Sequence, residues 1–209
     1  MTTAEILQYL QREIHTVAAA ATDEDGLPVT CAIDVMEADE GGLYFLTARG
    51  KNFYRRLANR QYIALTGMKG EDTMSSVAVS VRGRLRELGS DPLPRLLKKN
   101  PYMNQIYPTA ESRKALIVFQ LYEGEGQWFD LSKKPIERIS FSFGHVEKKE
   151  EGYFITAACD DCRACEAVCP QNCIDFSTTP AAIQKEHCLH CGLCAEVCPH
   201  EAVIWEGKR

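Results

Sequence analysis

Two cysteine runs with the same spacing decide how the C-terminal part of this chain is interpreted. Residues 159–170 read CDDCRACEAVCP, and residues 188–199 read CLHCGLCAEVCP. Each run has the spacing C-x2-C-x2-C-x3-C-P, so three thiols share one short loop and a fourth comes directly before proline. Nine of the ten cysteines lie after residue 158, and such tight spacing favours metal ligation over disulfide pairing. The pattern therefore indicates a metal-binding C-terminal domain.

Zinc and iron–sulfur clusters are the two candidates for that metal. A structural zinc site takes four ligands from two pairs, and each run here carries more cysteines than that arrangement needs. Residues 153–209 resemble the bacterial-type ferredoxins, in which the fourth cysteine of each run ligates the cluster held by the other run. The resemblance implies two [4Fe–4S] clusters with crossed ligand sets: Cys159, Cys162, Cys165 and Cys198 for the first cluster, and Cys188, Cys191, Cys194 and Cys169 for the second.

The same segment repeats itself with a period of 29 residues. Cys159 aligns with Cys188, and Ile174 aligns with Val203. Such a repeat predicts two half-modules packed about a pseudo-twofold axis. We expect a small α+β fold with strands at 153–155, 175–176, 182–184 and 203–205 and short helices at 163–168 and 193–197.

Several further residues near the cysteine runs have two possible roles each. Cys173 aligns with Ala202, and we expect it to be a small apolar filler beside a cluster; an extra ligand or a redox-active thiol is the alternative. We expect His187, His190 and His200 to be solvent-exposed loop residues, the alternative being that they tune a cluster through N–H donation to sulfur.

The first 146 residues contain many short apolar runs separated by turn signals. Expected strands lie at 15–21, 28–36, 43–47, 62–68, 76–88, 116–122 and 139–143, and expected helices at 4–13, 51–59, 92–99 and 102–106. Many turn-punctuated strands with few helices predict a closed or half-closed barrel. The charged segment 147–152 is the predicted linker between domain 1–146 and domain 153–209.

One segment of this half has the features of an anion site. Residues 43–51 read LYFLTARGK, a strand that runs through a glycine-containing turn into a helix. A lysine in the first turn of a helix is unfavourable unless an anion compensates it, so Lys51 is a candidate ligand and Thr47 contributes a hydroxyl at the strand end. Cys31 stands alone inside a strand, where a buried small hydrophobe is expected.

Residues 1–145 resemble the FMN-binding split barrels related to pyridoxamine 5′-phosphate oxidase. The resemblance is carried by the hairpin around Gly26 and by the segments 44–51, 57–59, 80–85, 100–102 and 106–108. It implies a mainly β split barrel with flanking helices that binds FMN at the interface of a homodimer. The positions implied for the phosphate are Thr47 and Lys51, helped by Arg49, and those implied along the isoalloxazine ring are Thr30, Ala32, Ile33 and Asp34.

The resemblance does not extend to the substrate of that family. No set of arginines suited to the phosphate of pyridoxamine phosphate can be carried over, so oxidation of vitamin B6 is not implied. Trp128 lies in a late segment that could reach the flavin.

Charge and hydropathy limit the kinds of partner that this chain is expected to bind. Residues 1–150 carry 20 acidic and 20 basic side chains, whereas residues 151–209 carry 9 acidic and 4 basic ones, which accounts for the net charge of −5. We therefore expect a redox partner protein with a basic docking face, and no nucleic acid. The N-terminus lacks a signal peptide and no apolar run approaches the roughly 20 residues needed to span a bilayer, so we expect a soluble cytoplasmic protein without a membrane partner.

The two halves together predict a flavin/iron–sulfur oxidoreductase. It would relay single electrons between the clusters and FMN, and from FMN to a small-molecule substrate. No G-x-G-x-x-G or P-loop motif is present, so electrons are not expected to enter from NAD(P)H through a dedicated domain. The alternatives are an electron-transfer protein without its own substrate and a redox or flavin-binding sensor.

Overall fold

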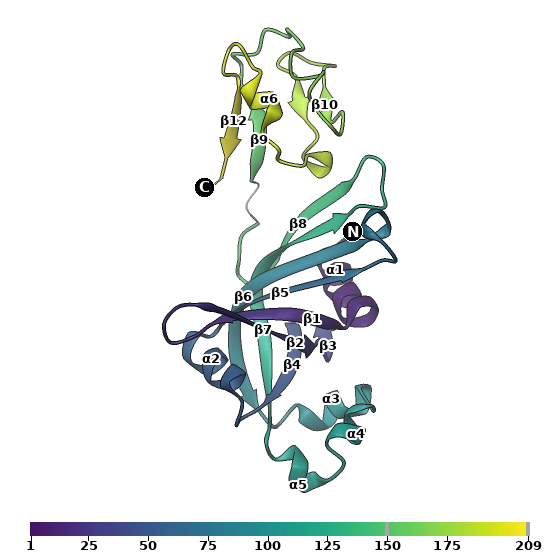
Figure 1. Ribbon diagram of the computed structural model, residues 1–209, viewed down its shortest axis with the longest axis vertical. Helices are drawn as coiled ribbons and strands as arrows, with labels where there is room; N and C mark the ends of the chain where they lie inside the picture. The colour runs from purple at the N-terminus through teal and green to yellow at the C-terminus, as the bar shows by residue number, and fades with distance from the viewer. Residues whose placement is uncertain (149–150, 208–209) are drawn as a thin grey trace. The chain divides into compact units, whose positions relative to one another are not determined.

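The computed structural model describes residues 1–148 and 151–207, which form two compact units (Figure 1). The first unit comprises residues 1–70, 78–127 and 141–147; the second comprises 71–77, 128–140 and 148–209. The domain division at 147–152 stays a prediction, and residues 149 and 150 of that linker lie outside the described part.

The N-terminal part of the chain is built on one antiparallel-rich sheet of eight strands. The strand order is β2-β1-β5-β6-β7-β4-β3, with β8 paired to β7. Because β2 also contacts β4, the sheet curls back on itself, and the predicted mainly β split barrel is confirmed. The strands are β1 (Thr16–Thr22), β2 (Pro28–Asp34), β3 (Glu37–Asp39), β4 (Gly42–Ala48), β5 (Tyr62–Lys69), β6 (Val77–Gly89), β7 (Leu116–Asp130) and β8 (Glu137–Phe143).

Short helices flank this sheet, as expected. They are α1 (Thr3–Tyr9), which continues into a π-helical turn at Leu10–Ile14, then α2 (Asn52–Arg60), α3 (Leu93–Lys99), α4 (Met103–Ile106) and α5 (Ala110–Arg113), with a 3-10 turn at Thr73–Ser75. No helix in the described ranges is both long enough and apolar enough to cross a bilayer.

The core of the barrel lies where β4 and β7 run side by side. Phe45 pairs with Phe119 in the register of these strands, and their rings stack with centroids 5.9 Å apart. Both side chains are almost fully buried, as is Leu57, which anchors α2 against the same core. Burial of one such side chain is worth about 1.5–3 kcal/mol, so these contacts help to hold β4, β7 and α2 together.

The C-terminal segment pairs its strands as the repeat predicts. β9 (Gly152–Ile155) lies antiparallel to β12 (Val203–Glu206), and β10 (Ile174–Asp175) lies antiparallel to β11 (Ala182–Ile183). A 3-10 turn at Lys185–His187 and helix α6 (Leu193–Glu196) complete it.

The helix expected over residues 163–168 is wrong. Arg163 adopts a left-handed backbone conformation with φ of 60°, which a right-handed helix cannot include. The segment instead closes as turns, in which the Glu166 N–H donates to the Arg163 carbonyl at 3.0 Å.

Candidate cofactor sites

The second unit contains two cavities lined by cysteine. One is lined by Cys159, Cys162, Cys165 and Cys198, and the other by Cys169, Cys188, Cys191 and Cys194 together with the additional Cys173. In each cavity, three motif cysteines come from one run and the fourth from the other. The structure thus brings the eight residues together in the crossed sets implied by the ferredoxin resemblance, while their binding of iron stays a prediction.

The backbone around the two cavities follows the same path twice. Residues in left-handed conformation occur in pairs 29 positions apart: Asp161 and His190, Arg163 and Gly192, and Asn172 and Glu201. Left-handed residues are uncommon outside glycine, so five non-glycine examples at repeat-related positions mark a loop shape that both runs share. The 29-residue period is therefore a property of the backbone as well as of the sequence.

Backbone amides donate to the sulfur atoms that close each cavity. The Ala202 N–H lies 3.3 Å from the Cys198 Sγ, and the Cys173 N–H lies 3.4 Å from the Cys169 Sγ. The His190 N–H donates to the Cys188 Sγ at 3.4 Å. Four thiols with N–H donors directed at sulfur are the donor set that a [4Fe–4S] cluster requires, so the residues present fit such a cluster.

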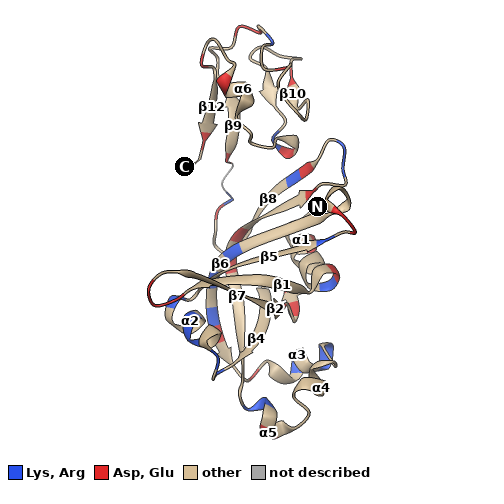
Figure 2. Cartoon of the chain, in the orientation of Figure 1, with Lys and Arg blue, Asp and Glu red and all other residues tan. Residues whose placement is uncertain are grey.

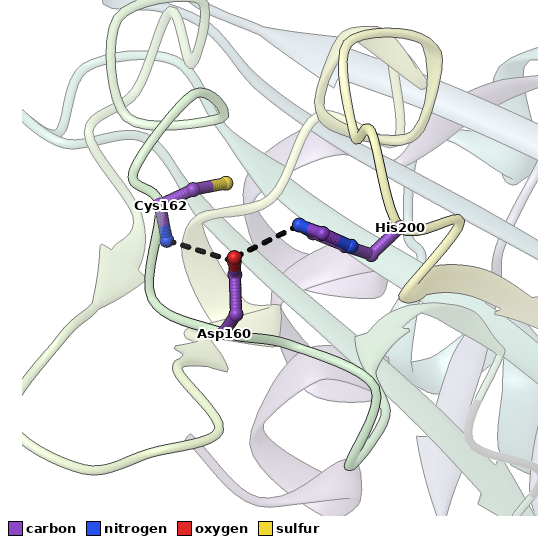
Figure 3. Close-up of side chains that lie close together, drawn as sticks. All are labelled: Asp160, Cys162 and His200. Carbon is purple, nitrogen blue, oxygen red and sulfur yellow. Dashed lines mark hydrogen bonds and ion pairs between the residues drawn. The ribbon is translucent and has the colours of Figure 1, made fainter.

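A polar contact between Asp160 and His200 borders the first cavity (Figure 3). The Asp160 carboxylate accepts the Cys162 N–H at 3.1 Å and lies 2.9 Å from the His200 Nε2. Their potential ligand atoms lie within 4.8 Å of one another, but all three residues are exposed. The pair links the loop of the first run to the residue that follows Pro199.

The histidines differ from expectation in two of three cases. His200 is exposed as expected, but His187 and His190 are half-buried. The His187 Nδ1 donates to the Ile136 carbonyl at 2.7 Å, because a carbonyl can only accept. His190 packs edge-on against Trp205, and burial, reinforced by the positive charges of Arg138 and Lys185, lowers its pKa to about 4. The expectation failed because tertiary packing, which local sequence does not encode, covers both rings.

In the first unit, the turn between β4 and α2 gathers the residues implied for the FMN phosphate. Thr47 is buried at the end of β4, and the Arg49 N–H donates to the Ala115 carbonyl on the neighbouring segment. Lys51 caps α2 in extended conformation and is exposed, with no acidic side chain in the first helical turn. This geometry leaves positive charge and free helix N–H groups at one place, as an anion site requires.

The residues implied for the flavin ring do not share one face. Strand alternation places Thr30 and Ala32 on the exposed face of β2, whereas Ile33 lies on the face of Cys31. Asp34 is already engaged: its Oδ1 accepts from the Thr16 hydroxyl and its Oδ2 from the Tyr102 hydroxyl, both at 2.7 Å. The contacts of these residues with a flavin stay a prediction. Trp128 is buried and belongs to the second unit.

Sequence reasoning missed a charged groove beside α2. Basic side chains of the helix and acidic side chains of the turn between β1 and β2 line this groove. The basic positions on α2 and the acidic turn are coloured in Figure 2. The groove has a volume of about 540 Å³, and its lining includes Asp23, Glu24, Asp25, Asn52, Arg55, Arg56, Asn59 and Arg60. The signal was the recurrence of arginine in 52–60. Cys31 lies close enough to Lys51 and Arg56 for their charges to oppose the rise that burial causes in its pKa.

The network around Asp34 gives a first prediction. Tyr102 lies between Asp34 and His15, and the His15 Nε2 is 2.9 Å from the tyrosine hydroxyl. Burial, and to a lesser degree the hydrogen bond and charge of Asp34, raise the pKa of Tyr102. Tyr102→Phe removes a hydrogen bond to a charged acceptor, so we expect a loss of about 1.5–3 kcal/mol in stability by urea unfolding. Tyr107 packs against the same hydrophobic core cluster as Tyr102, so Tyr107→Phe is the control. Equal losses in both variants would contradict a role for the Tyr102 hydroxyl.

Comparison with known proteins identifies both parts of the chain. Residues 2–129 match the family model described as pyridoxamine 5′-phosphate oxidase, and residues 158–202 match the 4Fe–4S dicluster domain. The chain therefore belongs to the pyridoxamine 5′-phosphate oxidase family and carries a C-terminal dicluster ferredoxin domain, as both resemblances predicted. These two domains support electron transfer as its general role.

Individual relatives match only parts of the chain. An uncharacterized ferredoxin of Methanocaldococcus jannaschii is 32% identical over 80 residues, which cover 37% of this chain and 45% of the ferredoxin. The chain thus spans about half the length of the curated relatives it matches.

Two solved structures show the same fold. A NimC/NimA family protein from Clostridium acetobutylicum matches with a TM-score of 0.57 at 16% identity, covering 67% of this chain and 92% of that one. PhzG from Burkholderia lata, solved with tetrahydrophenazine-1-carboxylic acid, matches with a TM-score of 0.51 at 16% identity, covering 70% and 84%. At this identity the likeness concerns the fold alone.

Proposed function

We propose that this protein is an oxidoreductase in which two [4Fe–4S] clusters exchange single electrons with an FMN bound to the split barrel. The observation that carries the proposal is the grouping of the eight motif cysteines into two cavities, four to each, on a chain that belongs to a flavin-binding family. When bound, FMN supplies a two-electron couple that can also be filled one electron at a time. Two bound clusters would supply the two electrons that complete reduction of one FMN requires, with two protons taken from water.

The chain's own residues would hold the cofactors in place. The eight cavity cysteines would ligate iron, and Lys51, Thr47 and Arg49 would bind the phosphate of FMN. The carboxylates of Asp160 and Glu166 are exposed beside the first cavity, which favours a donor or acceptor protein with a basic docking face. A homodimer with FMN at its interface and a small-molecule substrate are part of the proposal through the family resemblance.

An electron-transfer protein without its own substrate is the second candidate. The two cysteine-lined cavities support both candidates equally, because clusters bound there would carry electrons in either case and do not identify the final electron acceptor. The two candidates differ in whether reduced FMN is oxidised by an added organic acceptor at a saturating rate.

Cofactor content is the first test of the proposal. Protein prepared without oxygen and supplied with iron, sulfide and FMN should contain about eight irons and eight acid-labile sulfides per chain, together with FMN. Zinc in place of iron, or about four irons, would contradict the two-cluster proposal. Failure to retain FMN would leave an iron–sulfur protein and exclude the flavin route.

Lys51→Ala tests the phosphate site. The variant should lose about ten- to a hundredfold in affinity for FMN and far less for riboflavin, because a charge-assisted bond to phosphate is worth roughly 1.5–3 kcal/mol. Titration calorimetry with both ligands measures this difference. Lys98→Ala, an exposed lysine on α3, is the control. Equal losses for FMN and riboflavin would mean that the phosphate is bound elsewhere.

A further inference from the structure

The two halves of the ferredoxin repeat share a backbone but differ in several side chains that border the cavities. Cys173 in the first half of the repeat corresponds to Ala202 in the second, and its side chain lines the cavity of Cys169, Cys188, Cys191 and Cys194. Asp160 and His200, which border the other cavity, correspond to Leu189 and Gln171. The two cavities therefore expose a bound cluster to different surroundings.

The second cavity has a hydrogen-bond donor that the first lacks. Cys173 is buried, and its Sγ lies 3.6 Å from the Cys169 Sγ. Once Cys169 binds iron as a thiolate it can only accept, so the Cys173 thiol would donate. At the corresponding position of the first cavity, Ala202 offers its backbone N–H to Cys198 and has no side-chain donor. Hydrogen bonds to sulfur stabilise the more negative, reduced form of a cluster and raise its potential.

A hairpin of the split-barrel sheet contacts the second cavity, within the second unit. The backbone of Ile136, between β7 and β8, is bound at both polar atoms: its N–H donates to the Gln171 Oε1 at 3.2 Å, and its carbonyl accepts from His187 at 2.7 Å. Gln171 follows Cys169 by two residues, and His187 directly precedes Cys188. The hairpin is thus attached through the neighbours of two predicted ligands of the second cluster.

This attachment brings a positive charge to the neighbourhood of the second cavity. Arg138 lies on β8, two residues beyond Ile136, and is half-buried. The arginine beside the first cavity, Arg163, lies within 4.0 Å of carboxylate oxygens of both Asp161 and Glu166, which offset its charge. A half-buried cation is screened less by water than an exposed one, so it raises a nearby cluster potential more.

We propose that the second cavity holds the cluster of higher reduction potential, so that electrons accepted by this protein collect on the cluster beside the β7–β8 hairpin. The inference rests on the proposed function, because it takes both cavities to hold [4Fe–4S] clusters. The proposal also gives the direction of electron transfer within the protein. The first cluster, beside exposed carboxylates, receives electrons from a partner and passes them to the second cluster.

Redox titration followed by electron paramagnetic resonance tests the order of the two potentials. Cys162→Ala and Cys191→Ala each remove an exposed ligand from one cavity, so the core stays packed. The potential that remains in Cys162→Ala, which keeps the second cluster, should be higher than the potential that remains in Cys191→Ala. The reverse order would overturn the proposal.

Variants that keep all eight ligands test which residues raise the reduction potential of the second cluster. Arg138→Gln and Cys173→Ala should each lower the upper potential, by an equilibrium shift of about threefold to tenfold, tenfold being 59 mV for a one-electron couple. Arg138→Lys keeps the charge and should retain most of the upper potential, while Cys31→Ala, a cysteine outside both cavities, should change neither. If Arg138→Gln and Cys173→Ala leave the upper potential unchanged, the proposal is wrong. Iron content below about eight per chain in the unmodified protein would instead contradict the proposed function.

Discussion

Cys198→Ala is expected to remove the cluster held by the first cysteine run, although Cys198 belongs to the second run. Its thiol lines the cavity of Cys159, Cys162 and Cys165, whereas Cys169, which is nearer to them in sequence, lines the other cavity. A [4Fe–4S] cluster with three protein ligands loses its fourth bond and becomes labile. Iron should therefore fall from about eight to about four per chain.

Double variants reveal which cluster is lost. Cys198→Ala combined with Cys162→Ala should contain as much iron as either single variant, because both remove the same cluster. Cys198→Ala combined with Cys191→Ala should contain almost none. Two changes to one unit are non-additive, whereas changes to independent units add. The opposite pattern, with additivity between Cys198 and Cys162, would show that each run ligates its own cluster, and Cys31→Ala controls for general loss of thiols.

The grouping of three cysteines within each run followed from their spacing, and the assignment of the fourth to the other run followed from the resemblance to ferredoxins. Three thiols at C-x2-C-x2-C spacing must share a loop, and the 29-residue period predicted that the second loop has the same shape. The left-handed conformations of Asp161 and His190 did not follow, since positive φ is uncommon outside glycine even for Asp and His, which adopt it more readily than most residues. They are imposed by the loop, which must turn within two residues between successive cysteines.

The attachment of the β7–β8 hairpin to the second cavity could not be predicted. It uses the backbone of Ile136, which has no distinctive chemistry in the sequence, and the side chains of Gln171 and His187, which resemble ordinary loop residues. The strands themselves were expected to end at residue 122 and to begin at residue 139. They extend to Asp130 and from Glu137, because each supplies the other's backbone hydrogen bonds beyond the barrel.

The residues implied for the FMN phosphate lie together in the structure, whereas those implied along the ring do not, and the contacts of both sets with FMN stay predictions. Thr47, Arg49 and Lys51 are adjacent in sequence and stay together around one turn, so local sequence was sufficient. The run from Thr30 to Asp34 is a strand, and successive strand residues point to opposite faces, so it cannot present every member to one ligand. Asp34 is further occupied by a tyrosine that is 68 residues away in sequence.

The second large effect is expected for electron transfer from the clusters to FMN within one molecule. In protein with both clusters and FMN bound, clusters reduced by a chemical or photochemical donor should reduce the FMN at a rate that does not depend on protein concentration. A ferredoxin domain and a flavin-binding barrel share one chain, and β7 and β8 contribute residues to both compact units. Domains held together in this way meet at an effective concentration far above that of free partners.

A variant that lacks cluster ligands is the matched control for the rate of FMN reduction. The double variant Cys162→Ala and Cys191→Ala keeps Lys51 and the barrel unchanged, so it should bind FMN normally while flavin reduction falls to the slow rate of direct reaction with the donor. NAD(P)H alone should reduce the flavin slowly in both proteins, since the sequence contains no dinucleotide-binding motif. Rapid reduction by NAD(P)H that persists in the double variant would show a nicotinamide-dependent flavin reductase with an accessory ferredoxin. A rate that rises in proportion to protein concentration would show two tethered domains that exchange electrons only between molecules.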